Sequence, residues 1–420
     1  MLVFKFGGAS VKDAAAVRNV AQVLGHFEGE EILLVLSAMG KNTNLLEKLV
    51  DAYIKDLPYQ NLLEEFRTFH LNIIAELLGD DAREFYEVDN LLVELECVLD
   101  GDQAGKDYDY VYDQIVPYGE LVSTRILSHY LNHVGLRNRW LDARNFIVTS
   151  SDHRRARIDW SVTEDLIGRR AFKMVQKQLS ITQGFIGRTS SNAMTTLGRE
   201  GSDYTAAIFA YGLNAESVTI WKDVPGVMNA DPKRFPDAQL LSDISFKEAI
   251  ELAYYGASVI HPKTIQPLMR KGIPLHVKSF VDIDEPGTQV ADHQRKSVIQ
   301  LPCYIEKANQ VLISLASKDF SFIIEDNLSQ IFNALAACGI QVNLMQNTAI
   351  SFSICANFDQ RRIEQLTDMI GDQYHMDLTP ELNLFTVFNS HLDDEVKRHL
   401  KGAEVLLEQK TGNVLQWVHR

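Results

Sequence analysis

The first ten residues limit the fold more than any other stretch, because they predict a buried strand that ends at two glycines. Leu2–Phe6 is a short run of apolar β-formers around one lysine, Lys5, and is typical of a strand inside a parallel sheet. Gly7 and Gly8 carry no side chains, so another group can approach the backbone closely. A helical pattern begins at Asp13, and a helix after a glycine turn presents free N–H groups to a phosphate. These residues fit a phosphate-binding turn and an ordinary strand–helix turn equally well.

A second apolar run, Glu31–Leu36, predicts another buried strand, which ends in the polar loop Ser37–Asn44. Strand, helix and strand at this spacing form a βαβ unit, so the two strands should be parallel neighbours. Their following loops then meet at the carboxyl edge of the sheet, where an open α/β sheet binds its ligand. From Leu45 to about Asp113, apolar spacings of three and four predict a helical insertion. It could be a lid or a wall of the substrate site, or a purely structural subdomain.

The composition limits the class of protein. A chain of 420 residues exceeds one typical core and predicts two or three domains. The formal net charge of −15 argues against a nucleic acid or an anionic membrane as partner. No leader and no membrane-spanning stretch is evident in the sequence. The four cysteines have neither metal-ligand nor disulfide-scaffold spacing, so we expect reduced thiols in a soluble, cytoplasmic protein: Cys97, Cys303, Cys338 and Cys355.

Further along, short motifs lie where predicted strands end or helices begin. Tyr118-Gly119-Glu120 opens the helix after the insertion. The glycine-rich stretch Leu197–Asp203 precedes an apolar helix, in which Ser202 or Asp203 would be the N-cap. Arg199 in this loop suits a carboxylate or a phosphate. The other predicted elements are strands over residues 138–141, 145–148, 180–186, 217–221 and 273–277, the last one closing the domain, and helices over residues 165–178 and 246–255.

The rhythm of the chain changes after a polar stretch at residues 290–300, where we place a domain boundary. The elements that follow have the β-α-β-β-α-β order of a ferredoxin-like unit, with strands and helices over residues 311–316, 326–338, 341–345, 349–355, 360–370 and 382–388. A short helix near residues 394–400 and a hairpin over residues 404–418 come last. The second half of this region is therefore abbreviated.

Six motifs in this order resemble those of aspartate kinases, which are members of the amino-acid kinase family. They are Lys5–Ser10, Ser37–Asn44, Tyr118–Glu120, Gly198–Asp203, Trp221–Val227 and Gly256–Thr264. The resemblance implies an α/β three-layer sandwich with a mainly parallel sheet over residues 1–292. It also implies ferredoxin-like, ACT-type regulatory units over residues 300–420.

The implied reaction transfers the γ-phosphoryl group of ATP to the side-chain carboxylate of L-aspartate, giving 4-phospho-L-aspartate and ADP. This would be the first step of lysine, threonine and methionine biosynthesis. Mg²⁺ would accompany ATP, with no metal site of the protein's own. By resemblance, Lys5 bridges the transferring phosphoryl group, Gly7 and Gly8 supply N–H groups, and Asp203 organises Lys5 or the metal. Aspartate would be held by the residues Ser37, Thr43, Glu120, Arg199 and Ser202.

The nucleotide site is where the sequence departs from the family. The resemblance assigns it Lys222, Asp223, Met228, Lys233 and Lys263. The family usually has Thr at Lys222, Tyr at Met228 and Arg at Lys233, and it differs likewise in having Asp at Pro225 and Lys at Ser258. A missing tyrosine removes a stacking surface, and a lysine in place of an arginine loses the fork geometry.

The tail predicts regulation and assembly. ACT-type units pair side by side, which implies a homodimer or a larger oligomer. Asn343, Gln346 and Asn347 resemble the polar edge of a site for an amino-acid effector, lysine or threonine, although a plain polar strand end fits equally well. Two other functions stay open. The chain could be another amino-acid kinase, acting on glutamate, N-acetylglutamate or UMP, or a catalytically degenerate amino-acid sensor.

Overall fold

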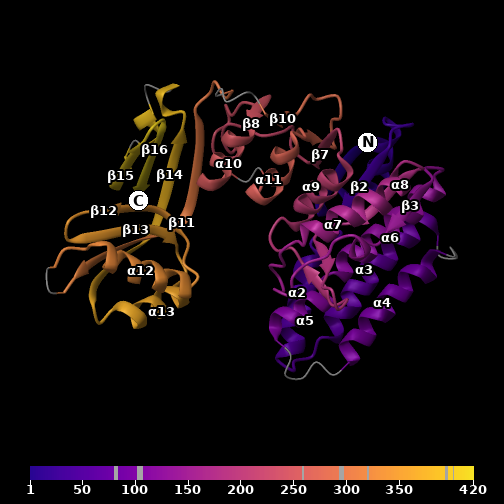
Figure 1. The fold of residues 1–420 in the computed structure, drawn as a ribbon, viewed down its shortest axis with the longest axis horizontal. Coiled ribbons are helices and arrows are strands. Elements are labelled where there is room, and N and C mark those ends of the chain that lie inside the picture. Colours follow the sequence, from indigo (N-terminus) through magenta and orange to yellow (C-terminus); the bar gives the residue numbers. More distant parts are fainter. Residues whose placement is uncertain are drawn as a thin grey trace. The chain divides into compact units, whose positions relative to one another are not determined.

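The structure is a computed structural model that describes residues 1–79, 84–101, 107–257, 260–292, 298–318, 321–392, 396–400 and 402–420. Ser258 lies outside these residues. The chain forms two compact units (Figure 1). The first comprises Met1–Val227, Leu240–Ile250 and Val259–Val298, and the second Met228–Gln239, Glu251–Ser258 and Ile299–Arg420. Within the described part of the chain, no helix has both the length and the apolar character that crossing a membrane needs.

The first unit is built on an eight-stranded sheet in the order β3-β4-β2-β1-β7-β9-β10-β8. At its centre β1 (Leu2–Phe6) pairs in parallel with β2 (Ile32–Leu36) on one side and with β7 (Ser217–Lys222) on the other. Every neighbouring pair is parallel except β9 with β10. The predicted mainly parallel sheet is thus confirmed. The remaining strands are β3 Asn138–Leu141, β4 Leu179–Gln183, β8 Asp243–Ser245, β9 Leu275–Ser279 and β10 Thr288–Ala291.

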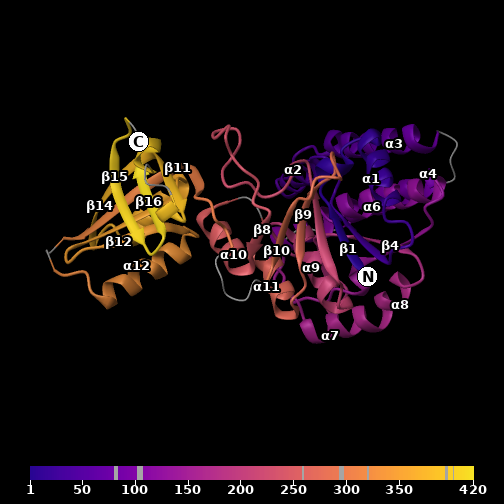
Figure 2. The same cartoon turned by 90° about the horizontal axis from the view of Figure 1, so that it is seen from above.

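Helices cover both faces of this sheet, which makes the predicted three-layer arrangement (Figure 2). Phe4 and Phe6 point into one large core with α1 (Ala14–Gly25) and the helical insertion. Because side chains alternate along a strand, Lys5 points to the other face, where α9 (Gly201–Leu213) packs. The insertion and the helix after it are α2 Asn42–Ile54, α3 Gln60–Leu78, α4 Glu84–Asp100, α5 Tyr108–Ile115 and α6 Tyr118–His133. The other helices are α7 Trp160–Leu166, α8 Phe172–Val175, α10 Phe246–Tyr255 and α11 Pro262–Lys271.

Three local predictions for this unit are wrong. Residues 145–148 do not form a strand, because a short 3₁₀ turn ends at Asn145 and Val148 makes only an isolated bridge. Helix α9 begins at Gly201 with Glu200 as its N-cap, so neither Ser202 nor Asp203 is the cap. Both lie in the first turn, where Asp203 is engaged by an ion pair instead. Strand β9 does not close the domain, since β10 follows it; a small hairpin is formed by β5 Ile186–Arg188 and β6 Met194–Thr196.

The second unit is a six-stranded antiparallel sheet in the order β12-β13-β11-β14-β16-β15. Its first four strands, with two helices on one face, have the ferredoxin-like order, which confirms the predicted ACT-type fold (Figure 1). Strand β14 starts at Tyr374 rather than at residue 382, and its far half pairs with β16 in the same sheet. The elements are β11 Cys303–Ser317, α12 Glu325–Ala337, β12 Val342–Asn347, β13 Ser351–Asn357, α13 Gln360–Ile370, β14 Tyr374–Phe388, β15 Val405–Thr411 and β16 Val414–His419.

Candidate active site

An ion pair between Lys5 and Asp203 lies at the carboxyl end of the central strand. The Lys5 ammonium is 2.6 Å from a carboxylate oxygen of Asp203, and the two side chains are only 12% and 8% exposed. Lys5 reaches this position because it points to the α9 face of β1, and Asp203 because it stands in the first turn of α9. A charged pair that is largely removed from water is held in a fixed geometry, which suits a group that must meet a phosphate.

Gly8 packs against the loop after β2, while a Cβ on Gly7 would lie 3.3 Å from the Lys5 ammonium. The Gly40 N–H donates to the Gly8 carbonyl at 3.0 Å, and the Ser37 N–H donates to the Phe6 carbonyl at 3.2 Å. A Cβ on Gly8 would lie 2.7 Å from the carbonyl oxygens of both Ala38 and Gly40. Only glycine fits there without moving the backbone. The two loops predicted to meet at this edge therefore do so.

Glu120 enters the same place from the first turn of α6. Its side chain is buried, and one carboxylate oxygen accepts a hydrogen bond from the Ala38 N–H at 3.2 Å. The other oxygen has no hydrogen-bond partner among the described residues. Burial raises the pKa of Glu120 to about 8, although the Ala38 N–H and the positive charge of Lys5 both lower it. A buried carboxylate with one unused oxygen is suited to a cationic ligand.

Arg199 stands in the loop that leads into α9, and its side chain is exposed. Gly198 before it has a positive φ of 77°, and the Gly201 N–H donates to the Gly198 carbonyl at 3.0 Å. His261 is the N-cap of α11 and accepts from the Lys263 N–H. Burial lowers the pKa of His261, and the charges of Glu200, Lys263 and Arg199 act on it too, so the start of α11 faces this loop.

The predicted hydroxyl contacts surround the same edge of the sheet. Ser37 follows β2 and Thr43 lies in the first turn of α2, and both are half-buried. Ser202 is buried beside Gly184, where a Cβ would lie 2.5 Å from its side chain. The structure thus brings Lys5 and Asp203 together with these hydroxyls and Glu120 at the ends of β1 and β2.

The nucleotide candidates are divided between the two units. Lys222 is half-buried at the end of β7, next to β1, while Asp223 and Lys263 are exposed. Met228 and Lys233 belong to the segment Met228–Gln239 of the second unit, so no single unit contains the whole set. Across the described residues, no three or more His, Cys, Asp or Glu side chains gather in a way that could hold a metal ion.

Two features of the site escaped prediction from the sequence. The first is the Ala38 N–H that donates to Glu120. Every residue except proline has a backbone N–H, so the residue type does not reveal this contact. Asp113 is completely buried on α5, near the loop that carries Arg199. Asp113 could have been noticed from its position between Tyr112 and Ile115. A carboxylate among apolar residues of a buried helix needs hydrogen-bond or charged partners.

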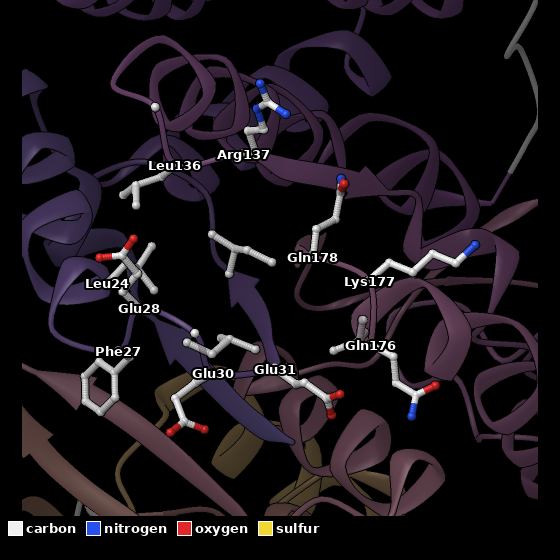
Figure 3. A pocket seen from close by; sticks show the side chains of 15 residues that line it. Leu24, Phe27, Glu28, Glu30, Glu31, Leu136, Arg137, Gln176, Lys177 and Gln178 are labelled. Atoms are coloured by element: carbon white, nitrogen blue, oxygen red, sulfur yellow. The ribbon is translucent and has the colours of Figure 1, made fainter.

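A separate hollow of about 310 Å³ lies at the amino ends of β2 and β4, the edge opposite Gly7 and Gly8 (Figure 3). Exposed side chains of both charges line it, among them Glu28, Glu30, Arg137 and Lys177. It is not part of the candidate active site.

Comparison with known proteins identifies the family. The model of the Amino acid kinase family matches residues 1–279. Bifunctional aspartokinase/homoserine dehydrogenase 2 of Arabidopsis thaliana is 30% identical over 385 residues, which are 89% of this chain and 42% of that protein. Lysine-sensitive aspartokinase 3 of Escherichia coli K12 is 33% identical over 355 residues, which are 84% of this chain and 78% of that protein. The chain belongs to the aspartokinases of the amino acid kinase family.

Solved aspartokinase structures agree over the full length of this chain. Escherichia coli aspartokinase III in complex with lysine and aspartate has a TM-score of 0.82 at 28% identity, covering 100% of this chain and 95% of that chain. The same enzyme with aspartate and ADP has a TM-score of 0.83 at 27% identity, covering 100% and 96%. The resemblance found from the six motifs is therefore confirmed. Against the bifunctional aspartokinase of Arabidopsis thaliana, the chain spans only 42% of the relative's length.

The effector candidates of this aspartokinase lie on β12, an edge strand of the six-stranded sheet. Gln346 and Asn347 are exposed. Asn343 is half-buried and engaged within the sheet, since its amide group donates to Gln310 at 2.8 Å and its oxygen accepts from Lys307 at 2.9 Å. Of the three candidates, Gln346 and Asn347 present their side chains to solvent.

Proposed function

We propose that this aspartokinase transfers the γ-phosphoryl group of ATP to the side-chain carboxylate of L-aspartate, giving 4-phospho-L-aspartate and ADP. The observation that carries the proposal is the buried Lys5–Asp203 pair, whose lysine charge also acts on the buried Glu120. One oxygen of Glu120 has no hydrogen-bond partner among the described residues. The relatives support it, because they are named aspartokinases and one was solved with aspartate and ADP.

The proposed chemistry needs no general base. The acceptor carboxylate is already ionised at neutral pH, so the difficulty lies in bringing two anions together. Catalysis then consists of positioning and of neutralising charge. Lys5 meets the transferring phosphoryl group, and Asp203 holds the ammonium in place from the other side. Gly7 and Gly8 allow the phosphates to approach the backbone.

In this proposal, aspartate is recognised by both charged groups on its α-carbon, the ammonium and the carboxylate. The unused oxygen of Glu120 accepts from the α-ammonium group, and Arg199 holds the α-carboxylate, for which its planar fork is suited. Ser37, Thr43 and Ser202 add hydroxyl contacts. This division of charge favours an amino acid over a nucleoside monophosphate as acceptor.

The nucleotide is proposed to contact Lys222, Asp223 and Lys263 of the first unit. For Met228 and Lys233 the nucleotide contact stays a prediction from the resemblance. Mg²⁺ bound with ATP would supply charge neutralisation. Asp203 is the carboxylate in the site that suits it, and the phosphates and water would complete its ligands, as is usual for this ion.

We also propose a division of labour along the chain. Residues 1–292 carry catalysis, and residues 300–420 form a regulatory region. The second ACT-type unit of this region is abbreviated. An amino-acid effector binds at the edge of β12 near Gln346 and Asn347, and this region also pairs two or more copies of the chain. The enzyme works in the cytoplasm, in amino-acid biosynthesis.

A comparison of acceptors tests the activity. In a coupled assay of ADP release, aspartate should support ATP turnover, whereas glutamate, N-acetylglutamate and UMP should not. The side chain of glutamate is one methylene longer, and N-acetylglutamate and UMP have no α-ammonium group for Glu120. Turnover with one of the other acceptors alone would assign a different kinase. A folded protein that binds amino acids but turns over with none of them would be a sensor.

A titration with amino acids tests the effector site. Lysine is the first choice, because one relative is named lysine-sensitive and was solved with lysine. We expect added lysine to reduce the rate, and Gln346→Ala to raise the concentration needed without changing the uninhibited rate. If neither lysine nor threonine binds or inhibits, the effector proposal is wrong.

A further inference from the structure

Asp113 is a buried carboxylate that the proposed mechanism does not use. It stands on α5, the last helix of the insertion, and is fully buried. One oxygen accepts from the Thr196 hydroxyl at 2.6 Å. The other accepts from His153 Nδ1 at 2.9 Å and from the Arg154 N–H at 3.0 Å. Three donors on one buried carboxylate make a well-satisfied polar centre.

These donors come from two segments that meet at the base of the Arg199 loop. Thr196 ends β6, shortly before Gly198 and Arg199. The Ala156 N–H donates to the Thr196 carbonyl at 3.1 Å, and a Cβ on Gly198 would lie 3.0 Å from the Arg154 carbonyl. Through these contacts Asp113 holds the 153–156 segment against the start of the loop.

The next residue on α5, Gln114, is hydrogen-bonded to the other end of β6. The Gln114 amide donates to the Met194 carbonyl at 3.0 Å, and its oxygen accepts from the Met194 N–H at 3.3 Å. Two consecutive side chains of α5 thus fix both ends of a short strand. Helix α5 of the insertion, together with the paired strand β5, therefore fixes where β6 ends and its following loop begins.

Arg154 is itself held by the same helix. Its backbone is left-handed, with φ of 61°, and its guanidinium makes an ion pair with Asp109 at 3.0 Å and lies 4.5 Å from the Tyr112 ring centroid. By contrast, Arg199 has no side-chain hydrogen bond or ion pair within the described residues. Its position therefore depends on the backbone of its loop.

We propose that Asp113 is a positioning residue that holds Arg199 in place for the α-carboxylate of the substrate, acting through Thr196 and Arg154. The proposal rests on the proposed aspartate kinase function. It gives the helical insertion a part in selecting the acceptor, because the carboxylate-binding arginine is presented on a loop that α5 anchors. The hydrogen bonds of Asp113 go to Thr196, His153 and Arg154, and none goes to β1 or α9, which carry Lys5 and Asp203. We therefore expect the Lys5 centre and ATP binding to change little.

The test separates substrate affinity from turnover. Asp113→Asn keeps the shape of the side chain but replaces one acceptor oxygen with a donor, which conflicts with the three donors around it. We expect KM for aspartate to rise about tenfold, the usual effect of losing a hydrogen bond to a charged group. The values of kcat and of KM for ATP should change by less than about threefold. Thr196→Val should give the same split, and Thr196→Ser, which keeps the hydroxyl, should restore the normal KM.

A double variant decides whether Asp113 acts through Arg199. In an Arg199→Ala background, adding Asp113→Asn should raise KM for aspartate no further, because residues that act through one contact are not additive. Asp165→Asn, which breaks only an exposed ion pair with Arg169, serves as control and should leave KM within about twofold. If Asp113→Asn fails to fold, the two Thr196 variants carry the same test.

The outcomes are distinct. An unchanged KM in a folded Asp113→Asn or Thr196→Val variant overturns the proposal, as does a full additional effect on top of Arg199→Ala. A fall in kcat with KM unchanged would assign a purely structural role and also overturns it. Absence of aspartate turnover in the unmodified enzyme is a different result, because it refutes the aspartate kinase function itself.

Discussion

Lys5→Ala is expected to reduce kcat by at least roughly a hundredfold, because it removes the charge proposed to meet the transferring phosphoryl group. No other described lysine or arginine forms an ion pair with Asp203. The same substitution leaves the Asp203 carboxylate, which is 8% exposed, without its partner. An unpaired buried charge costs about 3–5 kcal/mol, so the variant should also melt at a lower temperature.

A second substitution separates these two effects. In the Lys5→Ala background, Asp203→Asn removes the uncompensated charge and should recover much of the lost stability without recovering turnover. Lys12→Ala, an exposed lysine in the same turn, is the matched control and should be indistinguishable from the unmodified enzyme. The measurements are kcat at saturating ATP and aspartate, and the melting temperature of each variant. Near-normal kcat in a folded Lys5→Ala protein would remove Lys5 from the transfer centre.

The fold was accessible from the sequence where the signals are local. Apolar runs of β-formers marked β1 and β2, and the spacing between them required a parallel pair, which is what the structure has. The β-α-β-β-α-β order of the tail could be predicted for the same reason. Helix α9 shows the limit: Ser202 and Asp203 are typical N-cap residues, but Asp203 pairs with a lysine far away in the sequence, and the helix begins at Gly201.

The site was predictable as a set of residue types and not as a set of contacts. Motif order pointed to Lys5, Glu120 and Asp203, but the raised pKa of Glu120 follows from burial, which a single sequence does not reveal. Composition likewise places a boundary near residues 290–300, while Met228–Gln239 groups with the second unit. In that unit the Phe235 ring stacks on Tyr304 with ring centroids 5.3 Å apart. The two residues are far apart in the sequence, so a local sequence pattern cannot predict this contact.

Glu120 should make aspartate binding depend on pH. Without bound substrate, burial raises its pKa from 4.5 to about 8, so near neutral pH the side chain is mostly protonated. Binding the α-ammonium group requires the carboxylate, so aspartate must displace a proton. KM for aspartate should therefore fall as pH rises from 6 toward 8, by up to about tenfold per pH unit, and should level off above pH 8. Glu120→Gln should abolish this dependence and raise KM by roughly a hundredfold, because an amide cannot pair with an ammonium group. The exposed Glu94→Gln is the control.

Stability should change in the opposite direction, which makes the test for Glu120 sharp. Its folded pKa is higher than the unfolded one, so folding is favoured at low pH, and that contribution is lost as pH rises from about 4.5 through about 8. Above pH 8 the charged side chain costs up to about 5 kcal/mol when no substrate is bound. Glu120→Gln carries no charge to bury, so without substrate it should melt higher than the unmodified enzyme at pH 9 and at the same temperature at pH 4. If Glu120 lowers the stability at pH 9 and is also needed for a low KM for aspartate, its role is substrate binding rather than stabilisation of the fold. Equal melting temperatures at pH 9, with KM unchanged, would place Glu120 outside the aspartate site.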